Sequence, residues 1–269
     1  MRFRLPLLLL ALALGLAATS CNYGAYFIRA TTEPMLALEG RMDPYQRRQC
    51  LIMFMPGMLD TPDDYVNHGF FADAQAASTR CDLVAVDAHF GYYRGGTLRQ
   101  RVTEDVLRVA EARGYDEIWL VGISMGGMGS LLVTQVNEGR IRGVVLLAPF
   151  LGDDNLVRSI DEAGGLAEWD APDADDVDMN SEEGFDDALW IWLQGYANAP
   201  ENRPDLYIAV GTEDRLRPGV GLLAAVLPEN RSGTTAGGHN WNTWRVLWRN
   251  LLRNPPWDPG MGTPSFAAN

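Results

Sequence analysis

Three residues in the second half of the chain have the types and the order needed for an activated serine nucleophile. Ser124 lies in Gly-Ile-Ser-Met-Gly, residues 122–126, which has the pattern Gly-x-Ser-x-Gly. A serine hydroxyl attacks poorly until a neighbouring base takes its proton. His239 is the expected base, and Asp214 is the expected acid that orients its imidazole and stabilises the charged ring. The order serine, aspartate, histidine predicts nucleophilic acyl transfer.

The base and the acid are chosen by their positions at the ends of expected strands. Loops at the carboxyl ends of parallel strands converge on one crevice. His239 lies in a loop after the last, weak strand, and Asp214 follows the apolar run at residues 206–210, so both can meet Ser124. Other residues at strand ends are weaker alternatives: His89 for the base, and Glu213, Asp153 and Asp154 for the acid.

The segment around Ser124 has the strand–turn–helix pattern that such a serine requires. An apolar run at residues 118–121 leads into the turn, and a helix is expected over residues 127–137. Glycines in this turn let the strand and the helix approach closely, and the helix start places its positive dipole end beneath a developing oxyanion. This context favours a nucleophile over an incidental serine in a glycine-rich turn.

Apolar runs alternate with helical periodicity along the middle of the chain. This alternation favours the α/β class, with a mainly parallel sheet and helices on both of its faces. We expect one domain over residues 50–254, and Trp241, Trp244 and Trp248 should pack into its core from one face of the last helix. The expected strands are 51–55, 82–87, 117–123, 141–148, 206–210 and, weakly, 231–236; the expected helices are 63–78, 97–113, 127–137, 185–196, 215–227 and 241–253.

Two motifs resemble those of a known superfamily. Residues 122–127, Gly-Ile-Ser-Met-Gly-Gly, and residues 238–244, Gly-His-Asn-Trp-Asn-Thr-Trp, are similar to motifs of esterase-D-like and antigen-85-like esterases, which are serine hydrolases of the α/β-hydrolase superfamily. The resemblance spans roughly residues 51–253. It implies a single α/β-hydrolase domain and an oxyanion hole formed by the backbone N–H groups of Met58 and Met125.

The resemblance also implies an activity and a size for the sheet. The implied activity is hydrolysis of a small-molecule or lipid carboxylic ester through an acyl-enzyme, without a cofactor. One alternative is an acyltransferase, because only the second nucleophile differs, and another is a non-catalytic, lipid-anchored binding protein that kept the fold. The first two strands of the full fold have little room between Cys21 and Cys50, so we expect a reduced sheet of about six strands or more.

The composition argues against several other kinds of chemistry. The chain has 269 residues and a net charge of −13, and all 22 of its basic residues are arginine. Without lysine it has neither a Walker A phosphate loop nor a lysine Schiff base. The negative charge disfavours nucleic-acid binding. The three histidines and three cysteines lack the spacing of a metal site, so no metal is expected.

The negative charge comes from an acidic insertion at residues 153–197. Residues 153–187 contain fourteen acidic side chains and one arginine, and an amphipathic aromatic helix is expected over residues 185–196. The insertion is either a solvated loop that leads into a packing helix or a small cap whose aromatic side chains line a substrate pocket. A calcium loop is a third interpretation, although Ser181 stands where an EF-hand has glycine. Its candidate ligands are Asp176, Asp178, Asn180, Glu182 and Asp187.

The first 20 residues have the pattern of a signal peptide. Two arginines precede an uncharged apolar run at residues 5–18, which is shorter than a helix that spans a bilayer. The following Ala-Thr-Ser-Cys resembles a bacterial lipobox, so Cys21 is the expected lipidated residue, with ordinary cleavage as the alternative. We therefore expect export to the cell envelope, on a lipid anchor or in a secreted form. Residues 21–49 would be a linker, and residues 255–269 a proline-rich tail.

Cys50 and Cys81 are candidates for a disulfide, because an exported chain folds in an oxidising compartment. Each cysteine lies at the start of an apolar run that is expected to form a strand. In neighbouring parallel strands, both would lie at the same end of the sheet. The alternative is a pair of buried free thiols.

Overall fold

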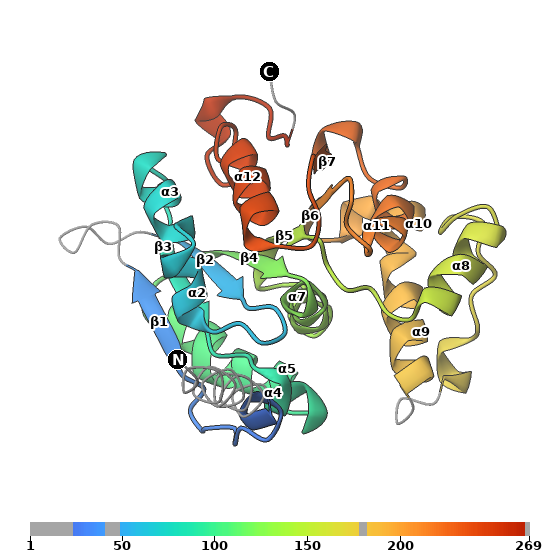
Figure 1. The fold of residues 1–269 in the computed structure, drawn as a ribbon, viewed down its shortest axis with the longest axis horizontal. Coiled ribbons are helices and arrows are strands. Elements are labelled where there is room, and N and C mark those ends of the chain that lie inside the picture. Colours follow the sequence, from blue (N-terminus) through green and yellow to red (C-terminus); the bar gives the residue numbers. More distant parts are fainter. Residues whose placement is uncertain (1–23, 41–48, 178–181, 267–269) are drawn as a thin grey trace, which may run out of the picture.

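A single mixed sheet of seven strands forms the centre of the computed structural model, which describes residues 24–40, 49–177 and 182–266 (Figure 1). The strand order is β1-β3-β2-β4-β5-β6-β7. β1 pairs antiparallel with β3, and the other neighbours pair in parallel. The strands are β1 (Ala37–Gly40), β2 (Cys50–Met55), β3 (Asp82–Val86), β4 (Glu117–Ile123), β5 (Ile141–Leu147), β6 (Asp205–Gly211) and β7 (Ser232–Thr235).

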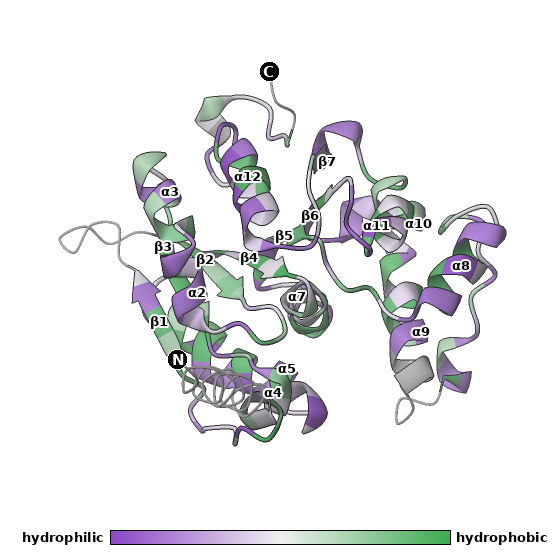
Figure 2. Ribbon diagram, viewed as in Figure 1, coloured by the Kyte–Doolittle hydropathy of each residue, from purple (hydrophilic) through white to green (hydrophobic). Residues whose placement is uncertain are grey.

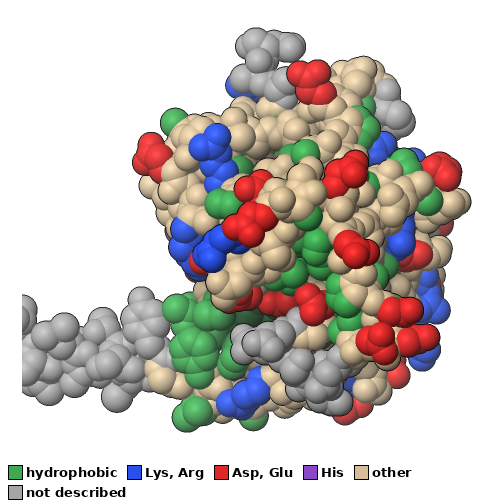
Figure 3. Space-filling model, turned by 90° about the vertical axis from the view of Figure 1, so that its right-hand side faces the viewer, with side chains coloured by type: hydrophobic (Ala, Val, Ile, Leu, Met, Phe, Trp, Pro, Cys, Tyr) green, Lys and Arg blue, Asp and Glu red, His purple; other side chains and the backbone are tan. Residues whose placement is uncertain are grey.

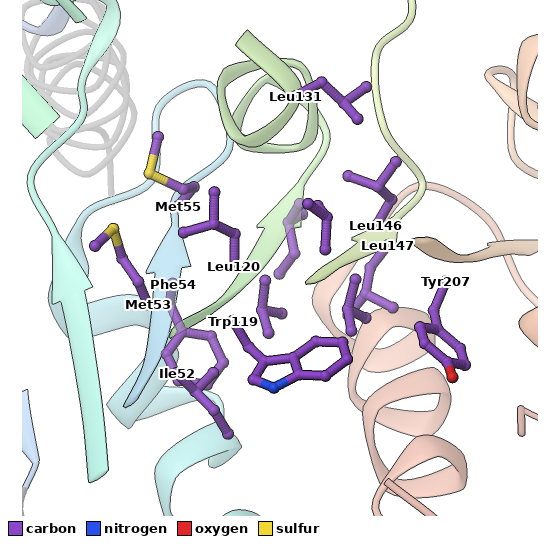
Figure 4. Packing of buried hydrophobic residues seen from close by; sticks show 14 of the residues in the cluster. Ile52, Met53, Phe54, Met55, Trp119, Leu120, Leu131, Leu146, Leu147 and Tyr207 are labelled. Atoms are coloured by element: carbon purple, nitrogen blue, oxygen red, sulfur yellow. The ribbon is translucent and has the colours of Figure 1, made fainter. Parts of the chain in front are cut away.

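The central strands are apolar because helices cover both faces of the sheet. All six residues of β2 are buried, and β4 and β6 each have a single partly exposed residue, at their first position. Such continuous apolar strands are typical of parallel sheets. Successive side chains alternate between the faces: in Figure 4, Leu120 lies on the side of α7 (Met125–Gln135), and Trp119 lies on the opposite side. The hydrophobic colouring in Figure 2 is accordingly concentrated in the strands and on the inner sides of the helices.

Helices cover both faces of the sheet. α3 (Phe70–Ala76) and α12 (Trp241–Leu251) lie over one face, and α5 (Leu98–Arg101) and α7 lie over the other (Figure 1). The expected helix over residues 63–78 is two helices, because Gly69 adopts a φ of 80° between them. Further helices are α2 (Pro62–Asn67), α4 (Phe90–Arg94), a π-helical stretch (Val102–Leu107), α6 (Arg108–Ala112), α10 (Gly195–Asn198) and α11 (Arg217–Ala224).

Both segments that flank the expected domain contribute to the fold. β1 lies within residues 21–49, which we expected to be a linker, and it adds an antiparallel edge strand to the sheet. The proline-rich tail is largely irregular apart from a short 3₁₀ helix at Pro259–Met261, yet it packs onto the core. Trp257 is fully buried, and its ring lies 5.8 Å from that of Trp119 and 5.7 Å from that of Trp248.

The described part of the acidic insertion includes two longer helices beside the sheet, α8 (Asp154–Glu162) and α9 (Glu182–Leu193) (Figure 1). The aromatic side chains of α9 pack inward. Trp190 is fully buried, and its Nε1–H donates to the carbonyl of Leu151 at 2.6 Å. Trp192 and Leu193 are also part of the hydrophobic core. The structure therefore agrees with a packing helix, because these side chains are buried in the core.

Cys50 and Cys81 form a disulfide at the amino-terminal ends of the neighbouring strands β2 and β3. The bridge spans a sequence separation of 31 residues, and both cysteines are fully buried. It lies at the end of the sheet opposite the loops that carry the expected nucleophile. The bridge therefore fixes the scaffold without being close to the chemistry.

We expect removal of this disulfide by the double substitution Cys50→Ala/Cys81→Ala to lower the free energy of unfolding by about 3–4 kcal/mol, the chain-entropy value for a loop of this length. Chemical denaturation of the oxidised protein and of the variant measures this difference. Dithiothreitol should destabilise the wild type by a similar amount and leave the variant unchanged. Equal stabilities under oxidising conditions would contradict the prediction.

Candidate active site

Ser124 occupies a sharp turn between β4 and α7. Its φ of 53° and ψ of −120° are unusual for a residue other than glycine. The turn is possible because two glycines allow close packing. A Cβ on Gly122 would collide with the carbonyl of Gly126, and a Cβ on Gly126 would collide with the carbonyl of Met55. The serine side chain is thereby held at the carboxyl end of the sheet, at the start of α7.

The side chains of Asp214 and His239 meet Ser124 at this end of the sheet. His239 Nε2 lies 2.9 Å from Ser124 Oγ, and His239 Nδ1 lies 2.8 Å from Asp214 Oδ2. The Asp214 side chain is fully buried, and that of His239 is 21% exposed. Asp214 Oδ1 also accepts a hydrogen bond from the backbone N–H of Leu216 at 2.9 Å, which fixes the carboxylate. One continuous hydrogen-bonded chain therefore links the acid, the imidazole and the serine.

Two backbone hydrogen bonds bring the loops of the acid and the base together. The N–H of Thr212 donates to the carbonyl of Thr235 at 2.8 Å, and the N–H of Glu213 donates to that of Gly237 at 3.0 Å. They extend the β6–β7 pairing into the loops, so Asp214 and His239 lie side by side although 25 residues separate them. α12 begins at Trp241, two residues after His239, and the Asn240 side chain caps it by accepting from Thr243 N–H.

The weaker alternatives lie elsewhere. The His89 side chain is buried at the start of α4, where its Nδ1 accepts from Gly91 N–H at 3.1 Å. Burial lowers the pKa of the His89 imidazole, and the nearby Arg29 lowers it further. Glu213 is exposed, and Asp153 caps α8 by accepting from Asn155 N–H, with Asp154 as the first residue of that helix.

The two expected oxyanion donors lie in segments that border Ser124. Met125 is the first residue of α7, a position whose N–H has no partner within its own helix. Met58 lies in the loop after β2, beside Gly57. A Cβ on Gly57 would be 3.6 Å from Ser124 Cβ. Both backbone segments are therefore close to the serine, with the start of a helix dipole beside it.

Sequence reasoning missed Asp60, which lies two residues after Met58 in the same loop. Trp241 Nε1–H donates to Asp60 Oδ1 at 3.1 Å. Burial raises the pKa of the Asp60 carboxyl to about 6, the Trp241 hydrogen bond opposes the rise, and the nearby Asp64 adds to it. The only sequence signal was the tryptophan two residues after His239, which we expected to be a core residue.

A cavity of about 710 Å³ lies between the loop after β5 and the acidic insertion, and Phe150 connects its lining to the backbone of Ser124. The N–H of Phe150 in its lining donates to the Ser124 carbonyl at 2.9 Å. Figure 3 shows acidic side chains gathered on this face of the molecule. The charged residues that line the cavity are Asp153, Asp154, Asp186, Asp187 and Arg215.

Comparison with known proteins identifies the architecture. A family model described as the alpha/beta hydrolase fold matches residues 51–178. A ferulic acid esterase has 17% sequence identity, covers 78% of this chain and 86% of its own, and gives a TM-score of 0.54. An S-formylglutathione hydrolase from Agrobacterium tumefaciens has 16% identity, covers 83% of this chain and 91% of its own, and also gives 0.54. The apoenzyme of an S-formylglutathione hydrolase from Staphylococcus aureus has 14% identity, covers 81% and 94%, and gives 0.52.

The chain has the α/β-hydrolase fold. Its mainly parallel sheet, with helices on both faces, confirms the expected fold class. The seven strands agree with the expected sheet of about six strands or more, and β1 is the strand that the sequence did not predict. A search of curated protein sequences finds no match.

Two further observations concern the parts of this α/β-hydrolase fold that the structure describes. Within residues 24–40, 49–177 and 182–266, no helix combines the length and the apolar character needed to cross a membrane. The same residues contain no cluster of three or more histidine, cysteine or acidic side chains arranged to hold a metal ion. Two residues of the candidate calcium loop, Asp178 and Asn180, lie outside the described residues.

Proposed function

We propose that this protein is a serine hydrolase that cleaves carboxylic esters through an acyl-enzyme. The observation that carries the proposal is the hydrogen-bonded chain from Asp214 through His239 to Ser124, set in an α/β-hydrolase fold. The structural neighbours, which include a ferulic acid esterase and an S-formylglutathione hydrolase, support the same class of reaction.

The geometry supports the following sequence of steps. Because His239 Nδ1 faces the Asp214 carboxylate, it carries the ring proton, and Nε2 accepts the proton of Ser124 as Oγ attacks the ester carbonyl. The buried Asp214 carboxylate stabilises the imidazolium that forms. The Met125 and Met58 amides donate to the oxyanion. His239 then protonates the departing alcohol, and water releases the acyl group by the same route.

The charges near the site favour neutral or cationic esters over anionic ones. Four aspartates and one arginine line the cavity beside Phe150, so its net charge is negative. Asp60 adds a further carboxyl near the nucleophile. Like charges repel strongly at short range in a partly buried site, and a carboxylate or phosphate group on the substrate would therefore bind poorly there.

We also propose that the protein acts in the cell envelope, on a lipid anchor at Cys21. The proposal rests on the signal-like sequence of residues 1–20 and on the lipobox resemblance, and these residues lie outside those that the structure describes. The Cys50–Cys81 disulfide supports an oxidising compartment. Labelling of living cells with a radioactive fatty acid should mark the wild type and leave Cys21→Ala unmarked.

Active-site labelling with a fluorophosphonate tests the proposed chemistry. We expect one covalent adduct, located on Ser124 by peptide mass spectrometry, together with hydrolysis of a series of 4-nitrophenyl esters of increasing acyl length. His239→Ala should lose both the adduct and the turnover, because its serine lacks a base. A folded wild type without adduct and without turnover would contradict the proposal and would favour a non-catalytic binding protein.

A further inference from the structure

Asp60 places a carboxyl close to the nucleophile, and the proposed acyl-transfer steps do not use it. Its backbone N–H donates to the carbonyl of Gly57 at 3.2 Å, which closes a tight turn after β2. The point where a Cβ on Gly57 would stand lies 2.6 Å from Asp60 Oδ2 and 3.6 Å from Ser124 Cβ. Asp60 and Ser124 therefore approach the same point from two sides, with no room for another side chain at Gly57.

The same carboxyl reaches across to the helix that follows the base. Asp60 Oδ1 accepts from Trp241 Nε1–H at 3.1 Å, over a sequence separation of 181 residues. Trp241 is the first residue of α12 and follows His239 by two positions. This contact therefore links the loop that carries the Met58 amide to the segment that carries the imidazole.

The indole of Trp241 is held firmly by its neighbours. It stacks on His68 with ring centres 4.5 Å apart and planes 8° apart, and it makes edge contacts with Tyr65 at 5.3 Å and Phe70 at 5.5 Å. It also contacts Trp244, whose ring in turn lies edge-on to His239 at 5.0 Å. The indole N–H is therefore a fixed donor, and its position is tied to that of the imidazole.

We infer that Asp60 is a positioning residue: its carboxylate joins the oxyanion loop to Trp241 and so sets the Met58 amide at a fixed place relative to His239 and Ser124. The inference rests on the proposed ester hydrolysis. Small errors in the placement of a donor weaken a transition state more than they weaken substrate binding, because the donor is aimed at charge that develops only during reaction.

Variants can separate the hydrogen bond from the charge. Asp60→Ala removes the acceptor, and Trp241→Phe removes the donor while keeping an aromatic ring. Asp60→Asn keeps an acceptor oxygen without the charge. Asp63→Asn on the exposed side of α2 is the matched control, since it removes a nearby carboxyl that lies outside the link.

We expect Asp60→Ala and Trp241→Phe each to lower kcat by about 10–100-fold, with KM nearly unchanged. The double variant should be no slower than the slower single variant, because both substitutions break one contact. Asp60→Asn should recover part of kcat, because it keeps a weaker acceptor, and Asp63→Asn should match the wild type. Thermal unfolding confirms that each variant is folded; if Asp60→Ala is not, Trp241→Phe and Asp60→Asn decide the question.

The pH profile gives a readout that loss of packing would not change. The titratable groups around Asp60 are Asp64 and Tyr65 on α2, His239 before α12, and Tyr26 from the amino-terminal segment. The Asp60 pKa of about 6 means that the carboxylate, which is the stronger acceptor for Trp241, forms as the pH rises through 6. The ratio of kcat in the wild type to kcat in Asp60→Asn should therefore rise with pH across this range.

Several results would overturn the link. The link would be wrong if Trp241→Phe kept the wild-type kcat, or if the losses of Asp60→Ala and Trp241→Phe were additive in the double variant. It would also be wrong if the ratio of kcat in the wild type to kcat in Asp60→Asn did not change with pH. A loss confined to KM for a choline ester, absent for its uncharged 3,3-dimethylbutyl counterpart, would instead make Asp60 a substrate-binding residue. If the wild type reacts with fluorophosphonate and hydrolyses esters, and Asp60→Ala and Trp241→Phe have the same kcat, only the inferred link is wrong. An inert, unlabelled wild type removes both the function and the link.

Discussion

Ser124→Ala should lower kcat for ester hydrolysis by about 10⁵-fold or more and should abolish fluorophosphonate labelling. The substitution removes the one oxygen that His239 Nε2 contacts at 2.9 Å, so no acyl-enzyme can form. The backbone of the turn, the cavity and the oxyanion donors stay in place. The variant should therefore still bind esters, and steady-state kinetics with a displacement assay for binding would show turnover lost and affinity kept.

Ser159→Ala is the matched control for this substitution. Ser159 lies on the exposed side of α8, and its hydroxyl donates to the Leu156 carbonyl at 2.8 Å. This variant should label and turn over as the wild type does. If Ser124→Ala retained even a hundredth of the wild-type rate, a different nucleophile or a directly activated water would have to carry the reaction, and the proposed acyl-enzyme would be wrong.

The nucleophile was predictable because its signal is local. A buried strand, a glycine-flanked serine and a helix follow one another within twenty residues, and each has its own pattern in the sequence. Asp214 and His239 were predictable for a topological reason, since loops after parallel strands meet at one edge of the sheet. The structure brings these three side chains into hydrogen-bonding distance, and their catalytic roles remain a prediction for the kinetics to test.

The parts of the fold that escaped prediction depend on contacts between distant segments. β1 is four residues long, alternates between exposed and partly buried positions, and becomes a strand only through its pairing with β3. α8 lies in a stretch so rich in aspartate and glutamate that its composition alone indicated a loop. It forms because Asp153 caps its first turn and Ile160 is buried beneath it.

Asp60 shows why a site cannot be read completely from motifs. Its partner Trp241 is 181 residues away, and its distance from Ser124 depends on a glycine at position 57. No local spacing signals either contact. Trp244 and Trp248 of α12 are buried in the core as expected, but Trp241 is only partly buried and donates a hydrogen bond beside the site.

Asp214→Asn should lower kcat by about 10⁴-fold while the fold and KM change little. The asparagine amide has nearly the same shape as the carboxylate, so Leu216 N–H can still bind the side-chain oxygen. The loss of activity is expected because the substitution changes which nitrogen of the His239 imidazole carries the proton. When the amide oxygen accepts from Leu216 N–H, the amide NH₂ group faces His239 Nδ1, which must then accept a hydrogen bond. The ring proton therefore moves to Nε2, and Nε2 can no longer accept the proton of Ser124.

Glu213→Gln provides the control for this prediction, because the neighbouring Glu213 side chain is exposed, and this substitution should leave kcat unchanged.

The pH profile supplies a further test. A carboxylate near the base has two roles: it selects the tautomer, and it stabilises the imidazolium that forms as Ser124 attacks. At high pH, hydroxide can take the serine proton directly, so the wrong imidazole tautomer costs less activity. The activity of Asp214→Asn should therefore recover partly above pH 9. A variant within tenfold of the wild type at pH 7 would mean that Asp214 only packs against His239, and the buried carboxylate would then need another role.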